Sequence, residues 1–301
     1  MPSFPGLHRY LLGDNPFIGV DHLSQERARE RQNRLDTTKI LEVIKTAIAN
    51  GAEGLLFSTH PVMYDVLKQM ETRADDPTIG LYPILPYAQS YVRTATEKGV
   101  VGLAREVLSR LKWKATAKAL ASGGISLASM DPERVLRAYV DTELDFLFNN
   151  APSEASLRSV LLHEVLTDLA VSFEAHQLLN SYANHIADKY HVMPGFVTRN
   201  FSKFVAFAVK SGMRLDQIIV LAPFNKVGFQ MNPSRESCER TLDQHRDAIV
   251  IAMSILASGY LEMIDALQYL SERKAIRSFV VGVSTPAHAR ETFQQMRRTL
   301  G

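Results

Sequence analysis

Short apolar runs alternate with amphipathic segments through the second half of the chain. Apolar, β-branched residues dominate four stretches: Val192–Thr198, Gln217–Phe224, Ala248–Met253 and Arg277–Val283. Each is followed by a segment with apolar residues at helical spacing: Ser202–Lys210, Ser234–His245, Leu261–Arg273 and Pro286–Arg298. Strands that are buried on both faces read as continuous apolar runs, so this pattern favours parallel strands connected by helices.

The first half of the chain repeats this plan less regularly. Four further strands are expected, which gives eight in all: Tyr10–Gly13, Gly54–Phe57, Ile79–Tyr87 and Phe146–Phe148. A helix is expected over Thr37–Asn50, with Asp36 as its N-cap. Regular alternation of this kind predicts an α/β fold, a (β/α)8 barrel that forms a single domain over residues 1–301.

Two connections are longer than a minimal βα unit. Between the third and fourth expected strands, a helix is predicted at Val100–Lys112 and another is predicted to begin near Asp131. Between the fourth and fifth, Ser153–Tyr190 carries two helical patterns, and the first contains Leu157, Val160, Leu161, Val165 and Leu169. These helical insertions after strands three and four are expected to cover the barrel opening or to form the contact of a homo-oligomer.

The composition and charge of the chain disfavour nucleic acid and membranes as binding partners. The chain is 46% hydrophobic and 22% charged, and its formal net charge of +2 gives no broad field for nucleic acid or an acidic membrane. It has one cysteine, no N-terminal leader pattern and no run of about 18 apolar residues. We therefore expect a cytoplasmic protein that binds a small molecule.

The junction of the last strand and the last helix carries the clearest binding signal. In a parallel barrel the reactive residues stand at the carboxyl ends of the strands. Thr285 can cap the last helix and Pro286 suits its first position, with Ser284 just before them. The free N–H groups and the dipole of such a helix start favour an anion, so a phosphate-bearing ligand is predicted here.

A second group of polar residues follows the first two strands. Asp14, Asp21 and His22 come after the first strand, and His60 comes after the second. Carboxylates and imidazoles serve in acid/base chemistry and also bind zinc or iron. Their spacing matches no recognised metal motif, so no metal site is assigned, and Asp14 fits a turn residue equally well.

The segment Val281–His288 contains Gly-x-Ser-x-Pro-x-His and resembles the last strand and helix of the aldo/keto reductases. Val250–Ala257 resembles their seventh strand, and Ala266–Leu270 resembles the helix between the two. This resemblance implies a (β/α)8 barrel that binds a nicotinamide cofactor, NADP or NAD. It also implies that Ser284, Thr285 and Arg290 face the adenosine-side phosphate.

Three further positions carry cofactor contacts by the same resemblance. Asn200 matches an asparagine that contacts the nicotinamide carboxamide in that family. Met253, followed by Ser254, stands where an aromatic residue stacks on the nicotinamide. Methionine can pack against the ring with less defined geometry.

The catalytic residues of that family are mostly replaced. The family uses an aspartate and a tyrosine after strand two, a lysine ending strand three and a histidine ending strand four. Here the aspartate position falls on Ser58, the lysine position on Leu85 or Pro86, and the histidine position on Asn149; only Tyr64 lies near the tyrosine's place. The tyrosine would lack the neighbouring cation that stabilises its conjugate base.

Three hypotheses follow. The first is an aldo/keto-reductase-like oxidoreductase with altered catalytic residues, in which these side chains surround the reacting atom: Asp14, His60, Tyr64 and Asn149. The second is a barrel that binds the same ligand without turnover, as a sensor or a subunit of an assembly. The third is a metal-dependent lyase, isomerase or hydrolase.

Overall fold

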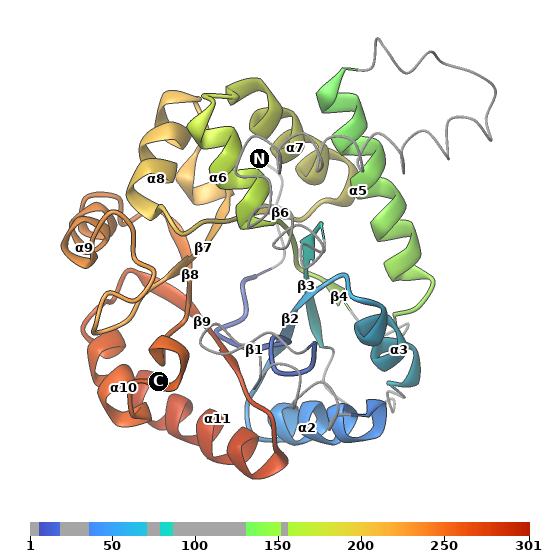
Figure 1. Ribbon diagram of the computed structural model, residues 1–301, viewed down its shortest axis with the longest axis vertical. Coiled ribbons are helices and arrows are strands. Elements are labelled where there is room, and N and C mark those ends of the chain that lie inside the picture. The colour runs from blue at the N-terminus through green and yellow to red at the C-terminus, as the bar shows by residue number, and fades with distance from the viewer. Residues whose placement is uncertain (1–5, 19–35, 71–78, 87–130, 152–155) are drawn as a thin grey trace, which may run out of the picture.

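The chain forms a closed barrel of parallel strands surrounded by helices (Figure 1). The computed structural model describes residues 6–18, 36–70, 79–86, 131–151 and 156–301. The strands are β1 (Tyr10–Gly13), β2 (Gly54–Ser58), β3 (Gly80–Leu85), β4 (Ser156–Leu157), β5 (Ser159–Leu162), β6 (Met193–Val197), β7 (Ile219–Pro223), β8 (Ile249–Met253) and β9 (Ile276–Gly282). The α-helices are α2 (Thr37–Ala49), α3 (Pro61–Gln69), α5 (Pro132–Phe148), α6 (Glu164–Ser172), α7 (His176–Tyr190), α8 (Phe201–Lys210), α9 (Arg235–Gln244), α10 (Met263–Ser271) and α11 (Pro286–Leu300), with 3-10 turns η2 (Leu215–Gln217) and η3 (Ala257–Gly259).

Closure follows from the strand pairing. β1 pairs with both β2 and β9, β2 pairs with β3, and the remaining strands follow in chain order back to β9, all parallel. The short β4 and β5 both pair with β3 and share one position, so the barrel has eight positions. The prediction of an α/β (β/α)8 barrel is confirmed.

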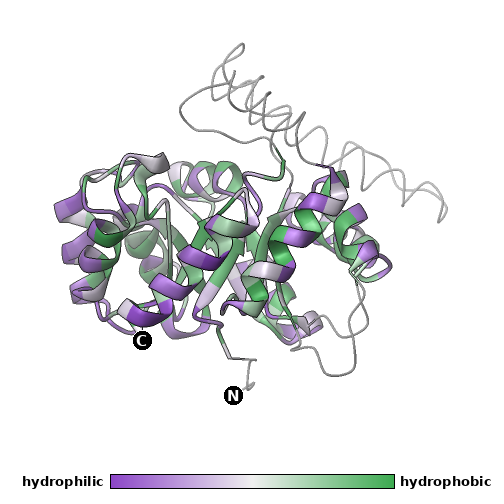
Figure 2. Cartoon of the chain, turned by 90° about the horizontal axis from the view of Figure 1, so that it is seen from below, coloured by the Kyte–Doolittle hydropathy of each residue, from purple (hydrophilic) through white to green (hydrophobic). Residues whose placement is uncertain are grey.

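Two apolar layers form the core. One lines the barrel interior and consists of Leu11, Leu56, Tyr82, Ile84, Leu161, Val197, Ile219, Leu221, Ile249, Ile251 and Val280. The other fills the space between the strands and the helices. In Figure 2 the hydrophobic colour concentrates on the central strands, whereas the surrounding helices alternate between hydrophobic and hydrophilic residues, as amphipathic helices do.

The amino end of the barrel is covered by the segment before β1. Leu7 packs against the inner apolar layer, and the backbone N–H of His8 donates to the Tyr82 hydroxyl at 3.0 Å. Gly80 permits this contact, because a Cβ there would collide with the His8 ring. The opposite end of the barrel is where a ligand site is expected.

Most helices begin where the sequence predicts. Asp36 caps α2 and Asp131 caps α5, each by accepting a backbone N–H. Two helices, α6 and α7, separate β5 from β6, which confirms the insertion after strand four. The helix predicted at Val100–Lys112 lies outside the described residues. None of the described helices combines the length and apolarity needed to cross a membrane.

The fourth strand is not where the sequence pattern predicted it. Phe146–Phe148 forms the last turn of α5, with Leu147 buried and the two phenylalanines about half exposed, at 52% and 49%. The strand is β5, from Ser159 to Leu162, which was predicted as part of a helix. All four of its residues are buried, and a short run that is apolar on both faces has no period that separates strand from helix.

Candidate functional site

The carboxyl ends of the parallel strands lie together at one end of the barrel, here called the mouth. Successive strand residues point to opposite faces, so the residue two positions after an inner-layer residue also points toward the barrel axis. Counting from Leu56, Leu161, Val197, Ile251 and Val280, the next inward positions are Ser58, His163, Arg199, Met253 and Gly282. Met253 packs against the inner layer, in agreement with this count. The mouth therefore combines an imidazole and a guanidinium with small and apolar side chains.

His163 directly follows the fourth barrel strand. It is the N-cap of α6, and its Nδ1 accepts the Val165 N–H at 3.2 Å. Burial lowers the pKa of His163, and the Arg199 cation lowers it further against the opposing effect of Glu164. The ring is thus neutral near pH 7, with its proton on Nε2. The signal in the sequence was a histidine directly after the apolar run Val160–Leu162. It was missed because this run was predicted as part of a helix and not as a strand.

Arg199 stands beside His163 at the mouth. Its guanidinium forms an ion pair with Glu164 on α6, with 2.6 Å between Nη2 and Oε1. The two side chains are 33% and 20% exposed, so solvent screens the pair only partly. Nothing in the local sequence pattern around Arg199 predicted this pairing.

A polar network fixes the turn that follows β6. Asp168 on α6 accepts from the Thr198 hydroxyl at 2.5 Å and from the Arg199 N–H at 3.2 Å. It also accepts from Nδ2 of Asn200 at 3.3 Å. Burial raises the pKa of Asp168, although the Thr198 hydrogen bond opposes the shift. The predicted cofactor residue Asn200 is thus already engaged through its amide nitrogen, and Asp168 orients the turn that carries Arg199.

Asp14 lies at the end of β1 and is 3% exposed. Its Oδ2 accepts the Ser58 N–H at 2.8 Å, and its carbonyl oxygen accepts from Phe17 at 2.7 Å. Burial raises the pKa of Asp14 to about 7, because it outweighs the backbone hydrogen bonds that favour the ionised form. The carboxyl joins the ends of β1 and β2 and is shielded from solvent.

His60 follows β2 and caps α3 through its Nδ1, which accepts the Val62 N–H at 3.1 Å. Burial lowers the pKa of this ring, so it too is neutral near pH 7. His60 and His163 therefore cap the helices after the second and fourth barrel strands in the same way.

Two predicted catalytic residues are placed differently from the expectation. Tyr64 is buried in α3 and contacts α5: its hydroxyl donates to Oε2 of Glu143 at 3.4 Å, and its ring packs edge-on against Phe146 at 4.6 Å. Burial, followed by the charge of Glu143, raises the pKa of Tyr64 further above its ordinary value. Asn149 is an exposed C-cap of α5 and does not end a strand. The residue that directly follows the fourth barrel strand is His163, because that strand is β5.

The predicted phosphate site has the expected local geometry. Thr285 caps α11 by accepting the His288 N–H at 3.2 Å, and Pro286 begins the helix. Ser284 is partly exposed and Arg290 is fully on the surface, one turn into α11. The start of this helix offers free N–H groups, a positive dipole end and a cation to an anion.

The turn after β8 is conformationally unusual. Ser254, Ala257 and Ser258 all have φ in the left-handed region, at 53°, 47° and 62°. Side chains with a Cβ seldom adopt this region, and such residues concentrate at ligand sites. Met253 ends β8 and Ser254 begins this turn, and both residues were predicted to contact a cofactor.

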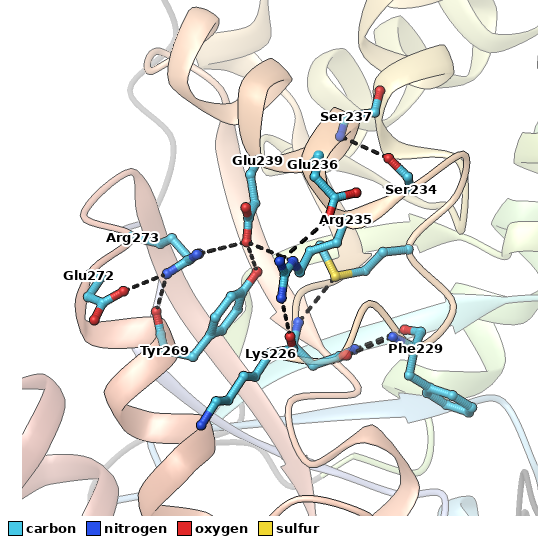
Figure 3. A network of polar contacts seen from close by, with 12 residues as sticks. Lys226, Phe229, Ser234, Arg235, Glu236, Ser237, Glu239, Tyr269, Glu272 and Arg273 are labelled. Carbon is cyan, nitrogen blue, oxygen red and sulfur yellow. Dashed lines mark hydrogen bonds and ion pairs between the residues drawn. The ribbon is translucent and has the colours of Figure 1, made fainter.

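An ion-pair network supports the turn after β7 (Figure 3). Glu239 on α9 accepts from the hydroxyl of Tyr269 on α10 at 2.7 Å, and it pairs at 2.7 Å with Arg273, which lies just after that helix. Arg235 donates to the Lys226 carbonyl at 2.5 Å, which ties the turn to α9. Asn225, fully buried, closes the same turn through two hydrogen bonds to the backbone of Phe229. These contacts fix the part of the mouth between β7 and β8.

Metal ligands were the third expectation from sequence. Among the residues that the structure describes, no three His, Cys, Asp or Glu side chains lie close enough to hold a metal ion. Asp21 and His22 lie outside those residues, so the metal-dependent hypothesis stays a prediction.

The chain has the fold of a (β/α)8 barrel, and this barrel is similar to solved structures of aldo-keto reductases. A Pseudomonas aeruginosa protein assigned to the aldo-keto reductases aligns with a TM-score of 0.59 at 11% identity, covering 97% of this chain and 91% of that protein. The glycerol dehydrogenase of Gluconobacter oxydans aligns with a TM-score of 0.55 at 9% identity, covering 97% of this chain and 88% of that protein. An aldo-keto reductase from Klebsiella pneumoniae, solved in complex with NADPH, aligns with a TM-score of 0.50 at 10% identity, covering 96% of this chain and 85% of that protein. No family model and no curated protein matches the sequence.

Proposed function

We propose that this protein is a nicotinamide-dependent oxidoreductase that reduces the carbonyl group of a small molecule at the mouth of the barrel. The observation that carries the proposal is His163, an imidazole that directly follows the fourth barrel strand, two residues after the inner-layer residue Leu161. This is the position at which the resemblance to the aldo/keto reductases implies a catalytic histidine. The likeness of the fold to an enzyme solved with NADPH supports the same assignment.

The residues around the start of α11 fit a phosphate-bearing cofactor. Ser284, the N–H groups after Thr285 and the Arg290 cation would hold its adenosine-side phosphate. Met253 and Ser254 would contact the nicotinamide end, as proposed from the sequence. When it is bound, the reduced cofactor supplies a hydride for the carbonyl carbon.

His163 performs the polar half of the reaction. The Val165 N–H occupies Nδ1, so Nε2–H is the group that donates to the carbonyl oxygen. A neutral imidazole of this kind polarises a carbonyl without giving up its proton. The proton that completes the alcohol comes from water at the mouth. Asp14 and His60 remain proposed members of the polar surroundings, and Tyr64 and Asn149 are assigned structural positions.

NADPH binding tests the first half of the proposal. We expect reduced-nicotinamide fluorescence to change as wild-type protein is titrated into NADPH. Arg290→Ala should weaken binding about tenfold or more, since a hydrogen bond to a charged group contributes about 1.5–3 kcal/mol. Arg298→Ala, an exposed arginine in the last turn of the same helix, is the matched control and should bind as wild type does. An absence of any fluorescence change would remove the cofactor from the account.

A barrel that binds without turnover is the competing function. It is favoured by Ser58 and Pro86, which stand where the resemblance implies an aspartate and a lysine. Turnover of any small aldehyde or ketone that is lost in His163→Asn, with NADPH affinity unchanged, would reject this alternative. NADPH binding without turnover of any carbonyl compound would favour it.

A further inference from the structure

The position of Arg199 makes it part of the substrate site. Val197 belongs to the inner apolar layer. Thr198 points the opposite way, because its hydroxyl donates to Asp168 on the surrounding helix α6. Arg199 therefore returns to the side of the barrel axis, at the end of β6 and next to the strand that precedes His163.

The guanidinium is anchored through Nη2, and its Nε lies buried on the other edge. Glu164 holds Nη2 at 2.6 Å, and Asp168 holds the backbone N–H at 3.2 Å. Within the described part of the chain, Nε of Arg199 is buried and has no hydrogen-bond partner. A buried donor without a partner costs about 1–3 kcal/mol, so a ligand that supplies an acceptor here gains that free energy. The ion pair with Glu164 keeps the fork in place for it.

The carboxyl groups nearby are hydrogen-bonded within the protein. Asp168 is occupied by Thr198, Arg199 and Asn200, and Glu164 is occupied by Arg199. His163 adds a second donor, because its Nδ1 is used within the protein. The two side chains thus offer donors to a ligand, one from a fixed cation and one from a neutral ring.

From this arrangement we infer that the mouth selects carbonyl substrates that also carry a carboxylate, which Arg199 binds through its Nε edge while His163 donates to the carbonyl oxygen. The substrate class is a small oxo acid or aldehyde acid. The inference rests on the proposed function for its reaction: the cofactor's hydride and one solvent proton convert the carbonyl to an alcohol. The carboxylate passes through unchanged. Neutral aldehydes would leave Nε without an acceptor.

Carboxylate binding is tested without turnover by thermal shift. Succinate should raise the Tm of the wild type in a dose-dependent manner at constant ionic strength, and neutral succinamide should not. Arg199→Lys keeps the charge but loses the Nε edge, so it should need at least about tenfold more succinate. Arg214→Lys is the matched control, since Arg214 forms a surface pair with Asp216 at 2.7 Å. Equal responses of Arg199→Lys and wild type, or of succinamide and succinate, would overturn the inference.

Turnover separates this inference from the proposed function. With NADPH, the wild type should convert succinate semialdehyde with a kcat/KM at least about tenfold above that of its methyl ester, and Arg199→Lys should remove this preference. Equal kcat/KM for acid and ester in the wild type would overturn the carboxylate assignment alone. The expected succinate response without turnover of any carbonyl compound would overturn the proposed function alone.

Discussion

Replacing Asp14 with asparagine should stabilise the protein at neutral and alkaline pH. The Asp14 carboxyl is 3% exposed, and burial raises its pKa from 3.8 to about 7. A carboxyl whose pKa is raised by folding favours the folded state fully below its unfolded pKa. This contribution is lost as pH rises from there through the folded pKa. The shift of 7 − 3.8 = 3.2, at 1.36 kcal/mol for each unit, corresponds to about 4 kcal/mol as an upper bound.

The asparagine side chain of the Asp14→Asn variant would keep an oxygen for the Ser58 N–H but could not ionise. Urea unfolding followed by circular dichroism should therefore give nearly equal free energies for Asp14→Asn and wild type at about pH 4, and a more stable variant at about pH 8. Asp65→Asn, at an exposed position of α3, is the control and should not change the pH dependence. A variant that is less stable than wild type by the same amount at every pH would refute the reasoning, since it would mean that folding does not shift the pKa of Asp14. The same variant also tests catalysis. If it is fully stable but has lost turnover, Asp14 takes part in the reaction.

Three further substitutions test the placement of individual residues. Tyr64→Phe removes the 3.4 Å hydrogen bond to Glu143, so we expect a loss of about 1 kcal/mol in urea unfolding and unchanged kcat, whereas loss of turnover would make Tyr64 catalytic. Gly54→Ala would place a Cβ 2.8 Å from the Tyr82 ring and 2.9 Å from the Gly80 carbonyl oxygen, so it should destabilise by about 1–3 kcal/mol, while Gly6→Ala, with nothing within 4 Å, should not. Glu239→Gln weakens the contacts to Tyr269 and Arg273 and should lower stability by about 1–3 kcal/mol; equal unfolding curves would show that this network does not support the turn after β7.

The sequence pattern predicted the fold where packing leaves a clear mark. β7 and β8 are continuous apolar runs because helices cover one face and the barrel interior the other. The caps Asp36 and Thr285 were predictable because a side-chain oxygen just before a helix can accept a free backbone N–H of its first turn. The prediction of β5 failed because a run of four buried residues looks the same in a strand and in a helix. Its pairing with β3 and β6 decides that this run is a strand.

The site was predictable only where it depends on local sequence. The start of α11 needs nothing beyond a strand, a cap and a proline, so its local geometry was predicted correctly. His163 and Arg199 come together through the pairing of β5 with β6, which no local pattern encodes. The direction of the Tyr64 side chain depends on where α5 packs. Sequence periodicity identifies the buried positions of α3, but it does not tell which of them face α5.

Transfer of a labelled hydride tests the central claim most directly. NADPH that is deuterated at its transferable position is incubated with succinate semialdehyde and protein, and the alcohol product is analysed by mass spectrometry. The account predicts one deuterium per product molecule with the wild type, and a rate at least about 100-fold lower with His163→Asn, within the range by which loss of one donor to a developing oxyanion lowers kcat. Product without deuterium, or an undiminished rate in His163→Asn, would contradict it.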